Sequence, residues 1–148
     1  MAAMDPKTPP PGSHSISEIL EESRSHLSRL TPDQALSQIQ EQSGDVPPAI
    51  LVDIRPVAQR AAKGEIEGSL VIERNVLEWR FDPRSDARLE IADRYDLRVI
   101  VFCQEGYTSS LAARELQKLG LLNATDVVGG YRAWNEAGLP EKIKQYGS

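Results

Sequence analysis

The chain has 148 residues, of which 40% are hydrophobic and 26% charged, and a formal net charge of -5, the balance of one globular domain. No Lys/Arg cluster gives the electrostatic footprint of nucleic-acid binding. The longest apolar run, residues 99–103, is too short to cross a membrane, and the N-terminus lacks a secretory signal. We therefore expect a cytoplasmic protein with neither a nucleic-acid nor a membrane partner.

The first 30 residues are expected to precede the main domain. Residues 1–15 are rich in Pro, Ser and Lys, which is typical of a flexible leader. Residues 16–30 place Ile16, Ile19, Leu20, Leu27 and Leu30 near helical spacing, which predicts an amphipathic helical extension. This helix is expected either to pack on the domain or to mediate a homodimer.

From residue 31 onward, helices and strands are expected to alternate. Thr31, Pro32 and Asp33 combine a capping hydroxyl, a proline suited to the first helical position and an acidic side chain, which predicts a helix over residues 32–42. Further helices are expected over residues 56–63, 76–81, 86–94, 109–119 and 131–137, and strands over residues 49–53, 69–72, 98–102 and 125–128. This alternation predicts an α/β fold with a mostly parallel sheet and helices on both faces.

The single cysteine, Cys103, follows the clearest of these strands. One cysteine excludes a disulfide within the chain, a CxxC redox pair and a Cys-rich zinc site. A lone cysteine is by default an inert buried side chain. Here, however, it stands at the edge where parallel sheets bind ligands, Gly106 permits a tight loop, and a helix starts at Thr108 or Ser109.

The loop after Cys103 is expected to form a cradle of backbone N–H groups around the sulfur. These groups and the positive end of the following helix favour the thiolate, which is the reactive form of the side chain. The same cradle would hold the negative charge of a persulfide or an oxyanion. Both histidines, His14 and His26, lie in the N-terminal extension, which argues against a Cys-His hydrolase.

Four segments in order resemble the rhodanese-like (thiosulfate sulfurtransferase) single-domain family. Residues 103–109 resemble its active-site loop, and residues 51–55 resemble its Asp-x-Arg signature. Residues 64–69 resemble its Gly-His-Ile-Pro-Gly-Ala element, with Glu65 and Glu67 in place of His and Pro. Residues 128–140 resemble its closing Gly-Gly…Ala-Trp…Gly-Leu-Pro run. The resemblance implies a rhodanese-like domain over residues 31–140, built on a mostly parallel five-stranded sheet, with a C-terminal tail over residues 141–148.

The resemblance also implies sulfur transfer. Cys103 would take the outer sulfur of thiosulfate or another small sulfane donor as a persulfide and pass it to a thiol or to cyanide, without a metal or organic cofactor. Asp53 and Arg55 would give structural support beneath the loop. Substrate-binding residues are expected in the rest of the loop and after the second strand: Gln104, Glu105, Gly106, Tyr107, Thr108, Ser109 and Arg74.

The loop departs from thiosulfate-using members, which often carry Arg or Lys directly after the cysteine. Gln104 and Glu105 occupy these positions, and Glu105 either points into solvent or repels an anionic donor. Arg74 could supply the missing positive charge, although a solvated surface arginine is an equal interpretation. Arg60 is a weaker candidate.

Two other functions stay open. One is a non-catalytic or regulatory rhodanese-like binding module, which the unusual loop and the extra helix leave possible. The other is a Cys-based phosphatase or arsenate reductase, which would need a longer loop and an arginine gripping the oxyanion where Thr108 and Ser109 stand.

Overall fold

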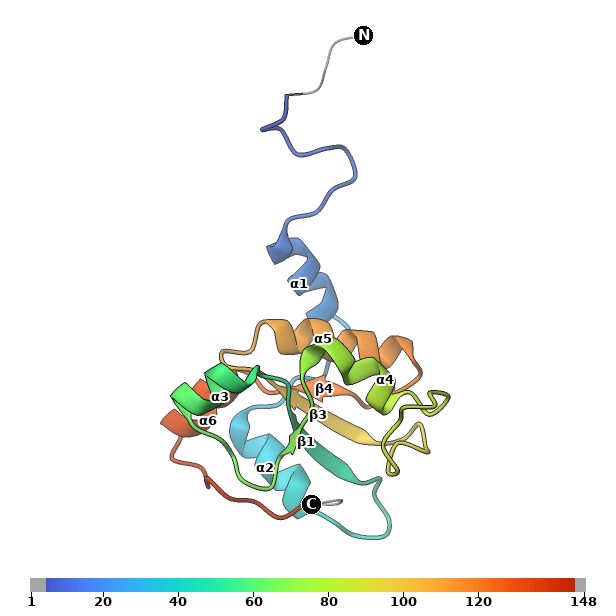
Figure 1. Ribbon diagram of the computed structural model, residues 1–148, viewed down its shortest axis with the longest axis vertical. Helices are drawn as coiled ribbons and strands as arrows, with labels where there is room; N and C mark the ends of the chain where they lie inside the picture. The colour runs from blue at the N-terminus through green and yellow to red at the C-terminus, as the bar shows by residue number, and fades with distance from the viewer. Residues whose placement is uncertain (1–4, 146–148) are drawn as a thin grey trace.

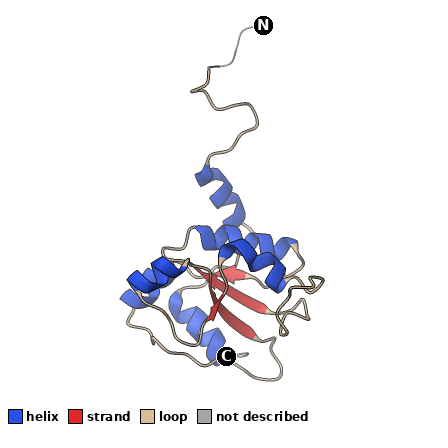
Figure 2. Cartoon of the chain, viewed as in Figure 1, coloured by secondary structure: helices blue, strands red, loops and turns tan. Residues whose placement is uncertain are grey.

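The computed structural model describes residues 5–145 and is built around a parallel sheet (Figure 1, Figure 2). Its strands are β1 (Ala49–Asp53), β2 (Leu70–Val71), β3 (Arg98–Phe102) and β4 (Thr125–Asp126), in the order β2-β1-β3-β4. All three pairings are parallel. The α/β prediction is confirmed.

The expected count of five strands is wrong, because the sheet has four strands within the described chain. Leu30 makes a single bridge with Val127, beyond the end of β4. Pro32 begins a helix two residues later, so this extended stretch cannot grow into a fifth strand. Glu67 and Lys142 form a similar isolated bridge.

Both faces of the sheet are buried. Because successive side chains of a strand point to opposite sides, each long strand contributes to a hydrophobic cluster on either face. In β1, Ile50 and Val52 join one hydrophobic cluster, whereas Ala49 and Leu51 join the other. The first cluster packs under α4 (Leu77–Phe81) and α5 (Thr108–Lys118), and the second against α2 (Pro32–Gln40) and α6 (Gly130–Glu136). Figure 1 shows α4 and α5 on one side of the sheet and α2 on the other. The remaining helical elements are α3 (Val57–Lys63), which buries no residue, and the short 3-10 turn η1 (Arg74–Val76).

The N-terminal helix α1 (Ile16–Arg24) is shorter than the expected range of residues 16–30. Its start is fixed by Ser15 and Glu18, which form a reciprocal capping box. Beyond Arg24 the chain turns, and Leu30 becomes strand-like: its N–H donates to the Asp126 carbonyl at 3.0 Å. This pairing competes with the helix and ends it. The helix packs against α5, and the chain before it, described from residue 5, extends away from the domain (Figure 1).

Residues 86–94 do not form the expected helix; they follow a series of turns. The Leu89 N–H donates to the carbonyl of Arg80, in α4, at 2.8 Å, and Ala92 is fully buried in the core. Tertiary contacts of this kind outweigh a weak local helix propensity.

The expected C-terminal tail is packed on the sheet as far as Gln145. Strand β2 begins opposite Val52, so it offers no partner to Leu51. The Gln145 side chain takes that place, accepting from the Leu51 N–H at 2.7 Å and donating to its carbonyl at 3.0 Å. The first part of the expected leader, residues 1–4, and the end of the tail, residues 146–148, lie outside the described residues.

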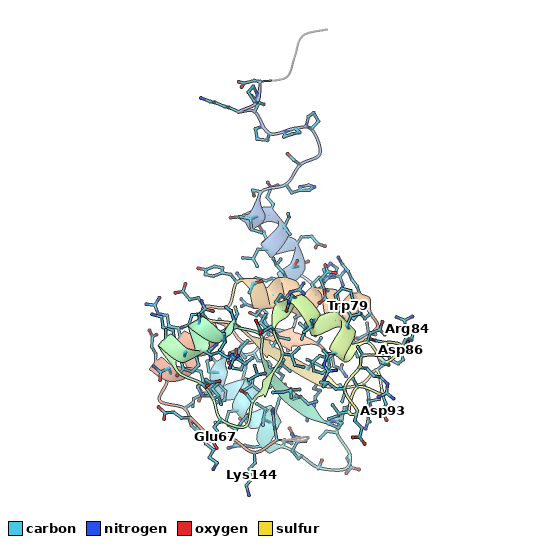
Figure 3. The ribbon with its side chains drawn as sticks, in the orientation of Figure 1. Glu67, Trp79, Arg84, Asp86, Asp93 and Lys144 are labelled. Atoms are coloured by element: carbon cyan, nitrogen blue, oxygen red, sulfur yellow. The ribbon has the colours of Figure 1, made fainter. Side chains whose placement is uncertain are left out.

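Several charged side chains project from the surface of the domain. Figure 3 shows Glu67, Arg84, Asp86, Asp93 and Lys144 on the outside of the domain, together with Trp79, which is 61% exposed. No helix in residues 5–145 is long and apolar enough to cross a membrane.

Candidate active site

Cys103 lies directly after β3, at the carboxyl edge of the sheet. Its side chain is only 6% exposed and belongs to the hydrophobic cluster beneath α4 and α5. The Gly106 N–H donates to Cys103 Sγ at 3.2 Å. One backbone amide of the expected cradle therefore points at the sulfur.

Gly106 has a left-handed backbone, with φ of +87°. A Cβ atom at this position would approach the Gly129 nitrogen to 2.8 Å and the Val127 carbonyl oxygen to 3.2 Å. Only glycine satisfies both the backbone angle and the space. The tight return of the loop toward the sulfur depends on this residue.

The start of α6 holds the other side of the loop. The N–H of Tyr131 donates to the Cys103 carbonyl at 2.8 Å, and that of Arg132 donates to the Gln104 carbonyl at 3.0 Å. A Cβ atom on Gly130 would lie 2.3 Å from the Cys103 carbonyl oxygen. The paired glycines at residues 129–130 thus let one backbone approach another.

Beneath the loop lies the ion pair of Asp53 and Arg55, both with fully buried side chains. Arg55 donates to the two Asp53 carboxylate oxygens, from Nε at 3.0 Å and from Nη2 at 2.7 Å. Its Nη1 donates to Gln104 Oε1 at 3.0 Å, and its guanidinium stacks on the Tyr131 ring at 4.3 Å. The pair ties the end of β1 to the loop and engages the Gln104 side chain from below.

The other loop side chains diverge. Glu105 is exposed and pairs with Arg132 at 3.7 Å, while Tyr107 is 60% exposed. Thr108 is exposed at the start of α5, whereas Ser109 is buried and donates its hydroxyl to Asp126 at 2.7 Å. The side chains of residues 104–109 therefore do not converge on one point, and backbone groups form the inner wall of the loop.

Arg74, predicted to bind an anionic donor, pairs with Glu78 at 2.6 Å. Arg60 similarly pairs with Glu65 at 2.9 Å. No hydrogen bond or ion pair within residues 5–145 joins Arg74 to the Cys103 loop.

Sequence reasoning missed a polar network on the α1 side of the loop. Its centre is Asp126, a fully buried carboxylate that accepts from Ser109, Ser110 and Arg29. Arg24 joins the network through the Ser110 hydroxyl at 3.0 Å. The available signal was an aspartate inside a predicted strand, since a buried carboxylate requires partners.

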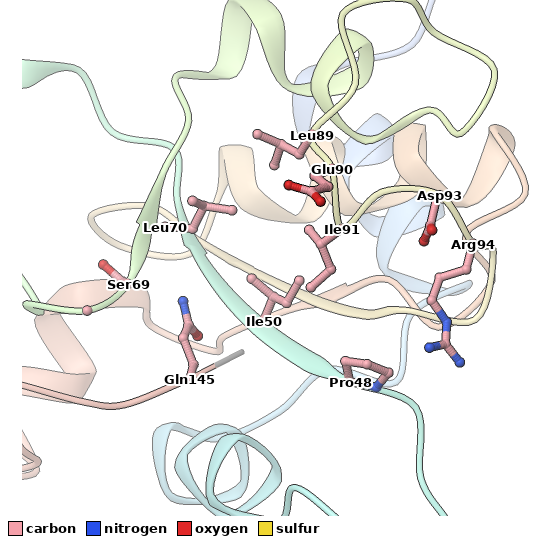
Figure 4. Close-up of a pocket in the computed structure, with 11 residues that line it drawn as sticks. Pro48, Ile50, Ser69, Leu70, Leu89, Glu90, Ile91, Asp93, Arg94 and Gln145 are labelled. Atoms are coloured by element: carbon pink, nitrogen blue, oxygen red, sulfur yellow. The ribbon is translucent and has the colours of Figure 1, made fainter. Parts of the chain in front are cut away.

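A cavity of about 710 Å³ opens at the opposite end of the sheet, where the strands begin (Figure 4). None of its lining residues belongs to the Cys103 loop: they are Pro48, Ile50, Gly68, Ser69, Leu70, Leu89, Glu90, Ile91, Asp93, Arg94 and Gln145. The cavity is therefore separate from the Cys103 loop. Residues 5–145 also contain no cluster of His, Cys, Asp or Glu side chains suited to a metal ion.

Comparison with known proteins agrees with this geometry. Residues 31–137 match the family model described as "Rhodanese-like domain". A thiosulfate sulfurtransferase GlpE from Actinobacillus succinogenes is 30% identical over 116 residues, covering 77% of this chain and 89% of that protein.

Two solved structures extend the comparison. A protein of unknown function from Rhodopseudomonas palustris, described as a possible tyrosine phosphatase, is 31% identical with a TM-score of 0.76, covering 90% of this chain and 98% of its own. The human single-domain sulfurtransferase TSTD1 is 29% identical with a TM-score of 0.50, covering 60% of this chain and 82% of its own.

Proposed function

Because the chain belongs to the rhodanese-like domain family, we propose that it is a sulfurtransferase in which Cys103 carries the transferred sulfur as a persulfide. The observation that carries this proposal is the 3.2 Å hydrogen bond from the Gly106 N–H to Cys103 Sγ. A backbone donor aimed at the sulfur stabilises the negative charge of the attacking thiolate, and of the same thiolate when it leaves in the second step.

The proposed reaction has two displacements. The Cys103 thiolate attacks the outer sulfur of thiosulfate, a new S–S bond forms, and the old S–S bond breaks as sulfite leaves with its electron pair. An acceptor thiolate or cyanide then attacks the outer sulfur of the persulfide, and Cys103 leaves as the thiolate. No net oxidant, reductant or cofactor is required, because each step exchanges one bond to sulfur for another.

The side chains near the sulfur bear on the choice of donor. The carboxylate of Glu105 would repel an anion, and Arg132 offsets this charge only in part, because it pairs with Glu105 at 3.7 Å and with Glu136 at 3.1 Å. The pKa of Arg132 is raised by its hydrogen bond with Glu136 and by the charge of Glu105, so Arg132 stays cationic. The rim of Glu105, Arg132 and Glu136 therefore carries one net negative charge, which works against an anionic sulfane donor such as thiosulfate.

Mass spectrometry after incubation with thiosulfate tests the proposal. We expect Cys103 to gain the mass of one sulfur atom, which a thiol acceptor or cyanide then removes. The variant Cys103→Ser should show no gain. Failure of the native protein to gain sulfur from thiosulfate, an organic thiosulfonate or a polysulfide would contradict the proposal and favour a non-catalytic binding module.

Phosphate-ester hydrolysis is a second candidate, because the Rhodopseudomonas palustris relative is described as a possible tyrosine phosphatase. A phosphatase of this kind needs an arginine within the loop itself, where Thr108 and Ser109 stand, to grip the phosphate. Here the Ser109 hydroxyl donates to Asp126, and Arg114 lies along α5 with its Nη1 donating to Gln117 at 3.4 Å. We therefore rank this activity below sulfur transfer. Hydrolysis of an aryl phosphate by the native protein, lost in Cys103→Ser, would reverse the order.

A further inference from the structure

Two arginines from the N-terminal segment reach the Cys103 loop at the same atom. Arg24, the last residue of α1, donates from Nη2 to the Gly106 carbonyl oxygen at 2.7 Å. Arg29 donates from its own Nη2 to the same oxygen at 3.1 Å. Gly106 is the residue whose N–H donates to Cys103 Sγ, so the two contacts meet on the residue that contacts the sulfur.

Holding this carbonyl constrains the peptide group between Gly106 and Tyr107. In a trans peptide the C=O and the following N–H point in opposite directions, and the described chain has no cis peptide bond. With the Gly106 carbonyl turned toward the arginines, the Tyr107 N–H must point away from them. Gly106 has a left-handed backbone with many accessible alternatives, so an external restraint selects one conformation.

Each arginine is itself fixed by a second contact. The Arg29 guanidinium forms a two-pronged ion pair with buried Asp126, at 2.8 and 3.1 Å. Arg24 donates from Nε to the Ser110 hydroxyl at 3.0 Å and lies over the Tyr107 ring, 5.8 Å from its centroid. Both guanidinium groups thus have a hydrogen-bond partner besides the Gly106 carbonyl, Asp126 for Arg29 and Ser110 for Arg24, which is what a positioning group requires.

Arg24 differs from the arginines considered earlier for this site in its ion-pair partners. Arg60, Arg74 and Arg132 each pair with a glutamate. Within residues 5–145, no carboxylate forms an ion pair with Arg24. Its positive charge is therefore not neutralised locally, and it acts on whatever anion the loop holds.

We propose that Arg24 and Arg29 are positioning residues for the Cys103 loop, and that Arg24 also supplies the uncompensated positive charge that Gln104 and Glu105 do not. The match to the rhodanese-like family model begins at residue 31, so both residues lie outside it. The N-terminal segment is thereby part of the active site and not an accessory to it. The catalytic consequence rests on the proposed sulfur transfer, whereas the ordering of the loop does not.

The variant Arg24→Gln is the primary test, because it removes the charge without leaving a buried carboxylate unpaired. We expect the Gly106 amide proton to exchange with solvent about tenfold faster, the size expected from losing one hydrogen bond to a charged donor. Exchange of the amides within β3 should not change. We also expect persulfide formation at Cys103 to slow by about tenfold, with partial recovery in Arg24→Lys, which restores the charge. Arg29→Lys keeps a charge beside Asp126 and is expected to have a smaller effect.

Arg84→Gln is the matched control. Like Arg24, Arg84 donates to a backbone carbonyl, that of Leu119 at the far end of α5, but unlike Arg24 it also contacts a carboxylate, that of Asp82. It should lower thermal stability without changing Gly106 exchange or the rate of persulfide formation.

The proposal is overturned if Arg24→Gln lowers thermal stability as Arg84→Gln does but leaves both loop measurements at the native value. It is equally overturned if Gly106 exchange accelerates while persulfide formation keeps its native rate. If the native protein forms no persulfide but Gly106 exchange still responds to Arg24→Gln, sulfur transfer fails and the ordering of the loop stands.

Discussion

Gly130 shows how one residue at the active site constrains the backbone. It has a left-handed backbone, with φ of +59°, and the place of its missing side chain is 2.3 Å from the carbonyl oxygen of Cys103. Gly138 also has a left-handed backbone, with φ of +68°, but nothing lies within 4 Å of its missing Cβ. Substituting each glycine by alanine therefore separates the free-energy cost of a left-handed alanine, which both variants have, from the effect of crowding the loop, which only Gly130→Ala has.

We expect Gly130→Ala to reduce persulfide formation at Cys103 by more than tenfold, because the added methyl group pushes the Cys103–Gln104 peptide away and disturbs the Gly106 contact. Gly138→Ala should cost about 1 kcal/mol of unfolding free energy, the usual penalty for alanine in a left-handed conformation, and leave the rate unchanged. Urea denaturation and the mass-spectrometric sulfur assay measure the two quantities. Equal rates of persulfide formation in Gly130→Ala and Gly138→Ala would contradict the prediction, because crowding at Gly130 would then have no effect on the Cys103 loop.

Asp53 and Arg55 illustrate a different constraint at the residue scale. Both side chains are fully buried, and Arg55 has hydrogen-bond partners in β1, in the loop and at the Gly64 carbonyl. Desolvation makes such a pair a weak source of net stability, but removing one partner leaves an uncompensated charge. The pair is better understood as fixing where the loop lies than as strengthening the fold.

At the scale of elements, α1 is held to the domain by polar contacts at its C-terminal end and exposes Ile16 and Ile19 near its start. Its first turn depends on the capping box between Ser15 and Glu18. The pKa of the Glu18 carboxyl is lowered, chiefly by the hydrogen bond from the Ser15 backbone N–H and then by the Ser15 hydroxyl. The ionised form is thus favoured by the folded helix.

Because the pKa of Glu18 is lowered in the folded protein, the first turn of α1 loses stability as the pH falls. The stabilisation is fully present above the unfolded pKa of glutamate, about 4.3, and is lost as the pH falls through the lower folded value. We expect the protection of the amides in the first turn of α1, relative to their intrinsic exchange rates, to fall on acidification below about pH 4, while α5 stays protected. In Glu18→Gln this transition should be absent, since glutamine does not titrate.

Glu22 provides the internal comparison for this experiment. Its pKa is also lowered, first by the hydrogen bond with His26, and it titrates in both proteins. An acid transition of the same size in Glu18→Gln would therefore assign the effect to Glu22 and not to the capping box.

At the scale of the whole molecule, two hydrophobic clusters share one sheet, and residues 25–30 connect α1 to the edge strand β4. A chain of this size with a shared sheet should unfold as a single cooperative unit. The homodimer through α1 stays a prediction, which sedimentation equilibrium can decide.

The two tryptophans allow the cooperativity to be measured. Trp134 is 2% exposed in the α2–α6 cluster, whereas Trp79 is 61% exposed. In Trp79→Phe, we expect the urea transition followed by Trp134 fluorescence to coincide with that followed by far-ultraviolet circular dichroism, which reports all helices. Separate midpoints would mean that the two faces of the sheet unfold independently.

Much of the fold was accessible from the sequence. The alternation of apolar strands with capped helices predicted the parallel sheet, and Thr31 was correctly identified as a cap. The segment around Cys103 could be interpreted as a loop because strand, glycine and helix start follow one another within a few residues. Features of this kind depend on short-range sterics and hydrophobic periodicity, which are determined by residues close together in the sequence.

Other features depended on tertiary contacts and could not be predicted in this way. The expected helix over residues 86–94 was replaced by turns whose backbone pairs with α4, and the sheet in residues 5–145 has four strands where five were expected. The Cys103 loop itself was recognisable from the sequence, but its ordering by Arg24 and Arg29 was not. Arg29 and Asp126 are 97 residues apart, and nothing near either residue marks it as a partner. Hydrophobic pattern and chain sterics determine which elements form, whereas the partners of isolated charged side chains are decided only when the folded chain brings them together and removes water from around them.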